Sequence, residues 1–269
     1  MSYMPMFESW RIRHEGMAFD VMLDLGYGED YPIRGKEWFF GVRIPLADRR
    51  EDGLAHDTEA QRLDVVENRI RSFVKDRGGQ YVGRRTGGNN RDLLFYLEAR
   101  PRGLEDRIRA SVGLEILFIS RDDTAWQGYE QLLPSARDWR QIEDSKRIIE
   151  LGLDETDPEE VFEILHRVET PLAKGAAALE GLFKKLELEE VTTTGEAPSF
   201  IVEGVQVGPL DPETIARVSF VLANKAPKAR GEYLSWTAEP IKGPLTQAPE
   251  NDDDLMSLLA DLARKDAEI

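Results

Sequence analysis

The stretch YVGRRTGGNNRDLLFY, residues 81–96, combines glycines with Arg84, Arg85 and Arg91. Glycine-rich loops and arginine side chains are groups that bind phosphate in proteins. A phosphate-binding loop leads from a strand into the N-terminus of a helix, but here an aromatic, extended segment follows the glycines. Gly and Asn also tolerate the positive φ of a hairpin turn. We therefore predict a hairpin between two strands and keep an anion site at Arg84, Arg85 and Arg91 as the alternative.

The remaining residue types give no pattern of a catalytic or metal centre. His14, His56 and His166 are far apart in the sequence and lack the spacing of a zinc site. The chain has no cysteine, which excludes thiolate chemistry and is typical of a reducing cytoplasm. The sequence also lacks a Gly-x-Ser-x-Gly elbow, a Walker loop and a dinucleotide-binding motif. We therefore predict a protein that is not an enzyme and uses no cofactor or metal, with His166 as an ordinary strand residue.

The negative charge of the chain is concentrated in its second half. The formal net charge is −16, of which residues 1–135 contribute −3 and residues 136–269 contribute −13. Such a charge repels nucleic acid and membrane surfaces and attracts basic partners, although solubility alone also explains it. The apolar runs are too short to cross a bilayer, and no secretory signal is readable at the start. We expect a cytoplasmic protein without direct nucleic-acid binding by the second half.

The first half carries strand and helix signals in the order β-β-β-α-β-β-α-β. Alternation in residues 19–25 indicates a half-buried strand. Residues 57–79 change to helical spacing, with Asp57 as the predicted cap and Gly78 as the stop. This order predicts an α+β domain with an antiparallel sheet and helices on one face.

The second half repeats this class of fold with a different order. A helix over residues 137–153 is predicted to bury Trp139, Ile142, Ile149 and Leu153 as one stripe. Then follows β-α-β-β-α-β, in which Thr170-Pro171 and Asp211-Pro212 are predicted caps of the two helices. In the first strand Phe162, Ile164, His166 and Val168 fall on one side. This arrangement is the ferredoxin-like fold.

Three regions follow from this organisation. We predict an N-terminal domain over residues 1–135, an acidic ferredoxin-like domain over 136–243 and an acidic tail over 244–269. The tail places Leu255, Leu258, Leu259 and Leu262 on one face of a short helix, which could enter a partner's groove or pack on its own domain.

The candidate protein-binding residues lie in the second half. An acidic segment between its first helix and first strand offers carboxylates to a basic partner, and an aromatic pair stands in the last strand. The aromatic pair is alternatively part of the core, with Trp236 buried beside Leu234. The candidates are Asp154, Glu155, Asp157, Glu159, Glu160, Tyr233 and Trp236.

Two family resemblances accompany this interpretation. The second half resembles the ribonuclease E activity regulator B family over about residues 138–240. The resemblance is carried by IEDSKRIIELGLDETDPEEVFEILHRV and by GEYLSWTAEP, where Ser235 stands in place of the family's glycine. The first half is similar to the domain-of-unknown-function 695 family through GGQYVGRRTGGNNRDLLFYLE and WQGYEQLLP, with Trp126 and Tyr129.

The resemblance implies a regulator that binds ribonuclease E and lowers its action on transcripts without cleaving RNA. An acidic module could occupy basic segments of that enzyme, or of another protein, by charge complementarity. The alternative is a protein or enzyme that binds an anion such as phosphate through the arginine-rich first domain. In that case Arg34, Arg43, Arg84, Arg85 and Arg91 would converge.

Overall fold

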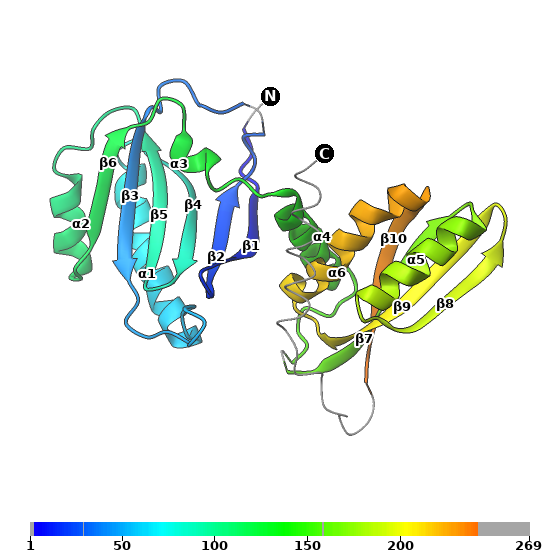
Figure 1. The fold of residues 1–269 in the computed structure, drawn as a ribbon. Helices are drawn as coiled ribbons and strands as arrows, with labels where there is room; N and C mark the ends of the chain where they lie inside the picture. The colour runs from blue at the N-terminus through cyan, green and yellow to red at the C-terminus, as the bar shows by residue number, and fades with distance from the viewer. Residues whose placement is uncertain (1–2, 29, 158, 242–269) are drawn as a thin grey trace. The chain divides into compact units, whose positions relative to one another are not determined.

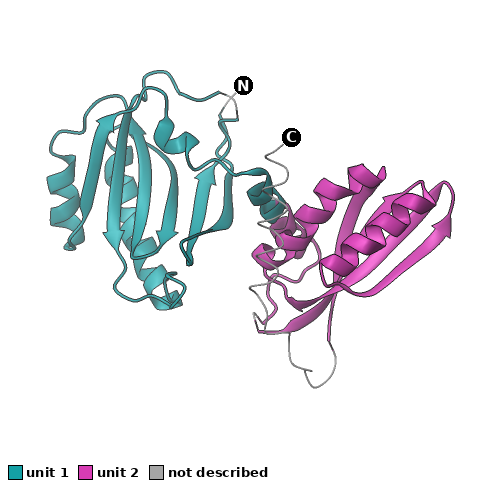
Figure 2. Ribbon diagram, viewed as in Figure 1, with its two compact units in different colours: residues 1–142 teal, residues 143–269 magenta. Residues whose placement is uncertain are grey.

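The structure of the chain is a computed structural model that describes residues 3–28, 30–157 and 159–241. Two compact units divide the chain, residues 1–142 and residues 143–269 (Figure 2). The division falls inside α4 (Ala136–Glu150), whereas the sequence predicts a boundary between residues 135 and 136. In the described residues no helix is both long and apolar enough to span a bilayer. The predicted tail over 244–269 lies outside the described residues.

The N-terminal unit is built on a six-stranded sheet of order β1-β2-β4-β5-β3-β6 (Figure 1). All neighbouring strands are antiparallel, as predicted. The chain order β-β-β-α-β-β-α-β is confirmed as well, with α3 added after the last strand. The elements are β1 (Phe7–His14), β2 (Met17–Asp24), β3 (Trp38–Pro45), α1 (Asp57–Lys75), β4 (Gln80–Gly87), β5 (Asn90–Leu97), α2 (Leu104–Val112), β6 (Leu117–Asp122) and α3 (Gln127–Glu130).

This sheet has a core on each face. The two long helices α1 and α2 cover one face, where Leu93 and Phe95 of β5 meet Leu63 and Ile70 of α1. On the opposite face, Leu94 and Tyr96 of the same strand pack with α3 and its flanking residues. Alternate residues of β5 therefore serve different cores, which explains why residues 93–97 of this strand are all apolar.

The second core depends on residues around α3. The Trp126 ring lies parallel to that of Tyr96, with centroids 4.1 Å apart, and the Tyr129 hydroxyl donates to the carbonyl of Asp24. Asp123 is buried and accepts the Tyr96 hydroxyl and the backbone N–H of Gly128. Packing thus accounts for the aromatic residues of the WQGYEQLLP motif.

The hairpin predicted at residues 81–96 is confirmed. Gly87 pairs with Asn90, so a two-residue turn of Gly88 and Asn89 joins β4 to β5. Gly88 has φ +65°, the conformation that favours glycine at the first turn position. The predicted start of α1 is wrong by one residue, since His56 is the N-cap and Asp57 begins the helix.

The C-terminal unit has a four-stranded antiparallel sheet of order β10-β7-β9-β8. With the chain order β-α-β-β-α-β, this is the predicted ferredoxin-like arrangement. The helices α5 and α6 share a core with β7 and β9, so they cover one face of the sheet (Figure 1). The elements are β7 (Val161–Thr170), α5 (Ala173–Lys185), β8 (Glu189–Glu196), β9 (Ser199–Pro209), α6 (Pro212–Lys225), the 3-10 helix η1 (Ala226–Ala229) and β10 (Glu232–Pro240).

The predicted buried stripe of the helix over residues 137–153 is half correct: Ile142 is buried and Leu153 packs partly buried against a core, but the other two members are exposed. Trp139 and Ile149 are 42% and 61% exposed, while the polar residues Gln141 and Asp144 are buried. Gln141 accepts the backbone N–H of Arg11 at 2.8 Å. Asp144 accepts from Ser219 and Trp236, at 2.6 and 2.8 Å. Polar groups with these partners lose less free energy on burial, so hydrogen bonds together with the apolar contacts of Ile142 and Ile148 determine the buried side of α4.

One of the two predicted proline-linked caps is confirmed. Asp211 accepts the backbone N–H of Thr214 at 2.9 Å, ahead of Pro212. The cap predicted at Thr170 is wrong, because α5 starts at Ala173 and the Thr170 hydroxyl donates to the carbonyl of Ala229.

Candidate functional site

Two arginines of the hairpin converge on carboxylates of α1. Arg84 lies 2.9 Å from Oε2 of Glu67, and Arg91 lies 2.5 Å from Oδ1 of Asp64 and 3.3 Å from Glu67. Arg91 and Glu67 are both almost fully buried. The Tyr81 hydroxyl donates to Glu67. Burial raises the pKa of Tyr81 most, and the adjacent Glu67 carboxylate raises it further. These ion pairs connect the hairpin to α1 and compensate the positive charge of both arginines.

Arg85 lies on the opposite face of the sheet from Arg84 and Arg91. It lies 3.1 Å from Asp92, which Arg43 also binds at 2.7 and 3.0 Å. The hydrogen bonds to Asp92 raise the pKa of Arg43. Arg43, Arg85 and Arg121 border a cavity of about 340 Å³, with Asp92 between the first two. The three hairpin arginines therefore do not form one anion site, and Arg34 is exposed in the loop before β3.

The predicted acidic residues of the C-terminal unit lie together in the connection between α4 and β7. The side chains of Asp154, Glu155, Asp157, Glu159 and Glu160 are all exposed. Asp157 also accepts the backbone N–H of Glu159 at 2.9 Å, which orders this connection.

The predicted aromatic pair lies on the helix-covered side of the second sheet. Trp236 is 2% exposed and donates to Asp144, while the Tyr233 hydroxyl lies 2.9 Å from Nδ1 of His166. Trp236 is therefore a core residue, as the alternative prediction stated. Leu234, expected beside it, is 44% exposed, because a bulge between Tyr233 and Ser235 shifts the register.

His166 is a fully buried histidine with both ring nitrogens satisfied. Nε2 lies 2.9 Å from Oε1 of Gln206, which only accepts, so Nε2 carries the proton and Nδ1 accepts the Tyr233 hydroxyl. Burial lowers the pKa of His166 to about 4. The prediction of an ordinary strand residue is confirmed. In the part of the chain that is described, no group of three His, Cys, Asp or Glu residues could hold a metal ion.

The opposite face of the second sheet carries a set of glutamates that the sequence analysis missed. The residues that pack on the described helices, such as Phe162, Ile164 and Val168, all lie on the other side of β7. Strand pairing places alternate residues of all four strands on the open side. We call this surface the acidic sheet face; its charged residues are Glu163, Arg167, Glu169, Glu189, Glu196, Glu203, Glu232 and Glu239.

Like charges stand next to each other on the acidic sheet face. Glu163 of β7 pairs with Glu239 of β10, and Glu169 pairs with Glu232. Arg167 forms an ion pair with Glu203 of β9, at 2.7 Å. Directly opposed like charges destabilise a sheet, so these two pairs lower the stability of the C-terminal unit.

An apolar centre accompanies these charges. Leu165 of β7 pairs with Val205 of β9, and Glu163 pairs with Val207 on the same side of the sheet. The acidic sheet face therefore combines a strip of aliphatic side chains with a border of carboxylates. The signal for it was present in the alternation of β7, whose second side reads Glu163, Leu165, Arg167 and Glu169.

A protein-family model matches the first half of the chain. Residues 9–133 match the model of a family described as a family of unknown function, DUF695, which confirms the resemblance stated for that half. The match ends before the C-terminal unit. A search of curated proteins finds no match. A crystal structure of an unknown protein from Galdieria sulphuraria aligns with 13% identity over 77% of this chain and 99% of that chain, with a TM-score of 0.21.

Proposed function

We propose that the protein is a non-enzymatic regulator whose C-terminal unit binds a cationic segment of another protein on the acidic sheet face. The opposed pairs Glu163–Glu239 and Glu169–Glu232 carry this proposal. Opposed carboxylates repel each other within the sheet, although Glu169 also accepts the Ser199 hydroxyl, whereas a bound lysine or arginine between each pair of carboxylates turns the repulsion into attraction.

The apolar strip supports a basic partner in particular. Lysine and arginine side chains bury their aliphatic stems along apolar surface while their charged ends reach polar groups. Leu165 and Val207 lie between the glutamates of neighbouring strands and offer that surface. A cationic segment, extended or helical, can therefore place its side-chain stems on apolar residues and its charged ends on carboxylates of the same face.

Ribonuclease E is the partner that we propose, and modulation of its action on RNA is the proposed effect. The resemblance of the second half to regulators of that enzyme supports this choice, together with the ferredoxin-like order of its strands. Because the acidic sheet face repels phosphate, the regulator would act through the enzyme's basic segments and would not bind the RNA itself.

The partner is tested by capture of ribonuclease E from the same source on the immobilised full-length protein, at low and at moderate ionic strength. We expect binding at low ionic strength that weakens as salt is added, since salt screens exposed charges. Absence of salt-sensitive binding to the purified enzyme would remove ribonuclease E as the partner.

Anion binding by the first domain stays an alternative, but the predicted convergence of Arg34, Arg43, Arg84, Arg85 and Arg91 is wrong, because Arg84 and Arg91 lie on the opposite face of the sheet from Arg43 and Arg85. Arg43, Arg84, Arg85 and Arg91 each have a carboxylate within 3.1 Å, so an anion would have to compete with these ion pairs.

A further inference from the structure

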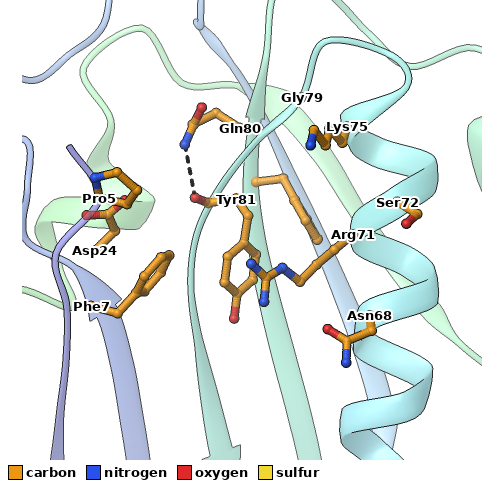
Figure 3. Close-up of a pocket in the computed structure, with 11 residues that line it drawn as sticks. Pro5, Phe7, Asp24, Asn68, Arg71, Ser72, Lys75, Gly79, Gln80 and Tyr81 are labelled. Atoms are coloured by element: carbon orange, nitrogen blue, oxygen red, sulfur yellow. Dashed lines mark hydrogen bonds between the residues drawn. The ribbon is translucent and has the colours of Figure 1, made fainter. Parts of the chain in front are cut away.

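A second cavity of the N-terminal unit lies between α1 and the start of β4. Its volume is about 580 Å³, within the range of roughly 300–1,000 Å³ common for small-molecule sites. One wall is α1, a second is residues 79–81, and Pro5 and Phe7 of the N-terminal segment border it opposite the helix (Figure 3). We call it the α1–β4 pocket.

The wall formed by α1 is polar and positively charged. Asn68, Arg71, Ser72 and Lys75 are spaced at i, i+3, i+4 and i+7, so they share one face of the helix, separate from the face that enters the core. Figure 3 shows these four side chains along the same wall of the pocket. Two of the four are cations.

Asp24, on the side of the pocket opposite α1, and Glu67, on α1, already accept hydrogen bonds. Oδ1 of Asp24 accepts the backbone N–H groups of Met6 and Gly26, and its Oδ2 accepts the Tyr3 hydroxyl. Glu67 accepts from Tyr81 and two arginines and stays 3.8 Å from Arg71, beyond hydrogen-bond distance. Within the described ranges, Lys75 has no ion-pair partner and Arg71 makes no hydrogen bond. The lining thus holds two cations, Arg71 and Lys75, against the one carboxylate of Asp24, so its charge is positive.

Arg71 is held in position without using its N–H groups. Its guanidinium lies over the ring of Tyr81, 4.3 Å from the centroid, and that ring is fixed by the hydrogen bond to Glu67. A stacked guanidinium keeps its donors in the plane, where they match the two oxygens of a carboxylate or phosphate. Lys75 stands one turn further along the helix and adds a second charge.

Aromatic surface lies across from these cations. Phe7 is 38% exposed, and its ring centroid is 5.7 Å from that of Tyr81. Figure 3 shows Phe7 on the side of the pocket that faces Tyr81 and Arg71. A ligand with a flat apolar group could lie against Phe7 while its anionic group reaches α1.

We propose that the α1–β4 pocket binds a small organic anion, with its carboxylate or phosphate on Arg71 and Lys75 and its apolar ring against Phe7. A cationic ligand is disfavoured by the two positive charges beside α1, and a neutral ligand forms no charge-assisted hydrogen bond with Arg71 or Lys75. This site is independent of the acidic sheet face, and it uses none of the hairpin arginines.

The test is a titration of the full-length protein, labelled for amide NMR, with phenyl phosphate, benzoate, benzyl alcohol and benzylamine. We expect saturable shifts centred on residues 68–81 with one or both of the aromatic anions. The better of the two identifies the anionic group. Benzyl alcohol and benzylamine should bind at least about tenfold more weakly, since each lacks the charge-assisted contact.

Two variants locate the site. Arg71→Gln combined with Lys75→Gln should lower the affinity for the aromatic anion by at least about tenfold, whereas Arg121→Gln, in the other cavity, should leave it unchanged. Equal binding of benzyl alcohol and the anions by the wild type would overturn the proposal, even if the double variant failed to fold. So would shifts centred on Arg43, Arg85 and Arg121, or no saturable shift with either aromatic anion.

Discussion

Glu163 of β7 and Glu239 of β10 stand directly opposite each other in the antiparallel pairing of their strands. Both side chains are exposed on the face away from the described helices, and the pair Glu169–Glu232 repeats the relationship at the other end of the same two strands. Two such pairs in one ladder cost stability without any benefit to packing. On our proposal they are retained because a cationic partner segment binds there.

The first prediction separates folding from binding at this pair. Glu239→Gln removes one member of the opposed pair and should stabilise the protein by about 0.2–1 kcal/mol, while it weakens partner binding. Denaturant unfolding measures the stability, and Glu155→Gln, in the exposed connection, is the control with little change expected. A loss of stability in Glu239→Gln would show that the carboxylate supports the fold.

A second prediction concerns Trp236, which lies in the core and not at an interface. Trp236→Phe keeps most of the ring but leaves Asp144 without its indole donor, so the free energy of unfolding should fall by about 1–3 kcal/mol. Partner binding by the folded variant should be unchanged. A variant of wild-type stability that has lost binding would place Trp236 in the interface instead.

Burial of His166 predicts a pH dependence of stability. The folded protein holds this histidine neutral down to a pKa of about 4, whereas the unfolded chain takes up the proton near the ordinary value of 6.5. Stability should therefore fall as the pH drops from about 6.5 to about 4, by on the order of 3 kcal/mol, with no contribution above that window. His166→Gln removes this titration, so its stability should change less over the same window. Equal slopes for wild type and variant would contradict the assignment.

The two sides of the hairpin should respond differently to loss of an arginine. Arg91→Met removes one of the cations that neutralise the buried Glu67 carboxylate, so the free energy of unfolding should fall by about 3 kcal/mol. Arg85→Met removes a side chain that is 37% exposed and should cost less than about 1 kcal/mol. Thermal or denaturant unfolding of the two variants measures these losses of stability. Similar losses in both variants would mean that the ion pairs with α1 do not stabilise the hairpin.

Local sequence patterns predicted the order of all the strands and of the longer helices, but not the short helices α3 and η1. The alternation of β7 identified its buried side, and Gly88 with Asn89 identified the hairpin turn. Both signals depend on residues close together in the chain, because strand period and turn conformation are local properties.

The contacts that decide the sites are not local. Asp144 is buried because its partners, Ser219 and Trp236, come 75 and 92 residues later. The ion pairs of Arg84 and Arg91 could not be predicted, because their partners Asp64 and Glu67 lie on α1, outside the hairpin. Likewise, the glutamates of β7 were readable by alternation, but the opposition of Glu163 and Glu239 needs the strand order.

The measurement that tests the central claim most directly compares two variants with equal charge loss. One carries Gln at Glu163, Glu169, Glu232 and Glu239 on the acidic sheet face. The other carries the corresponding amides at Asp154, Glu155, Glu159 and Glu160 in the connection before β7. Both keep the same net charge, so they differ only in which surface is neutralised.

The affinity of each variant for a basic segment of ribonuclease E is measured as a function of ionic strength. We predict that the sheet variant loses most of its affinity and its salt dependence, while the connection variant stays close to wild type. The reverse order, or equal small losses in both variants, would contradict the assignment of binding to the acidic sheet face.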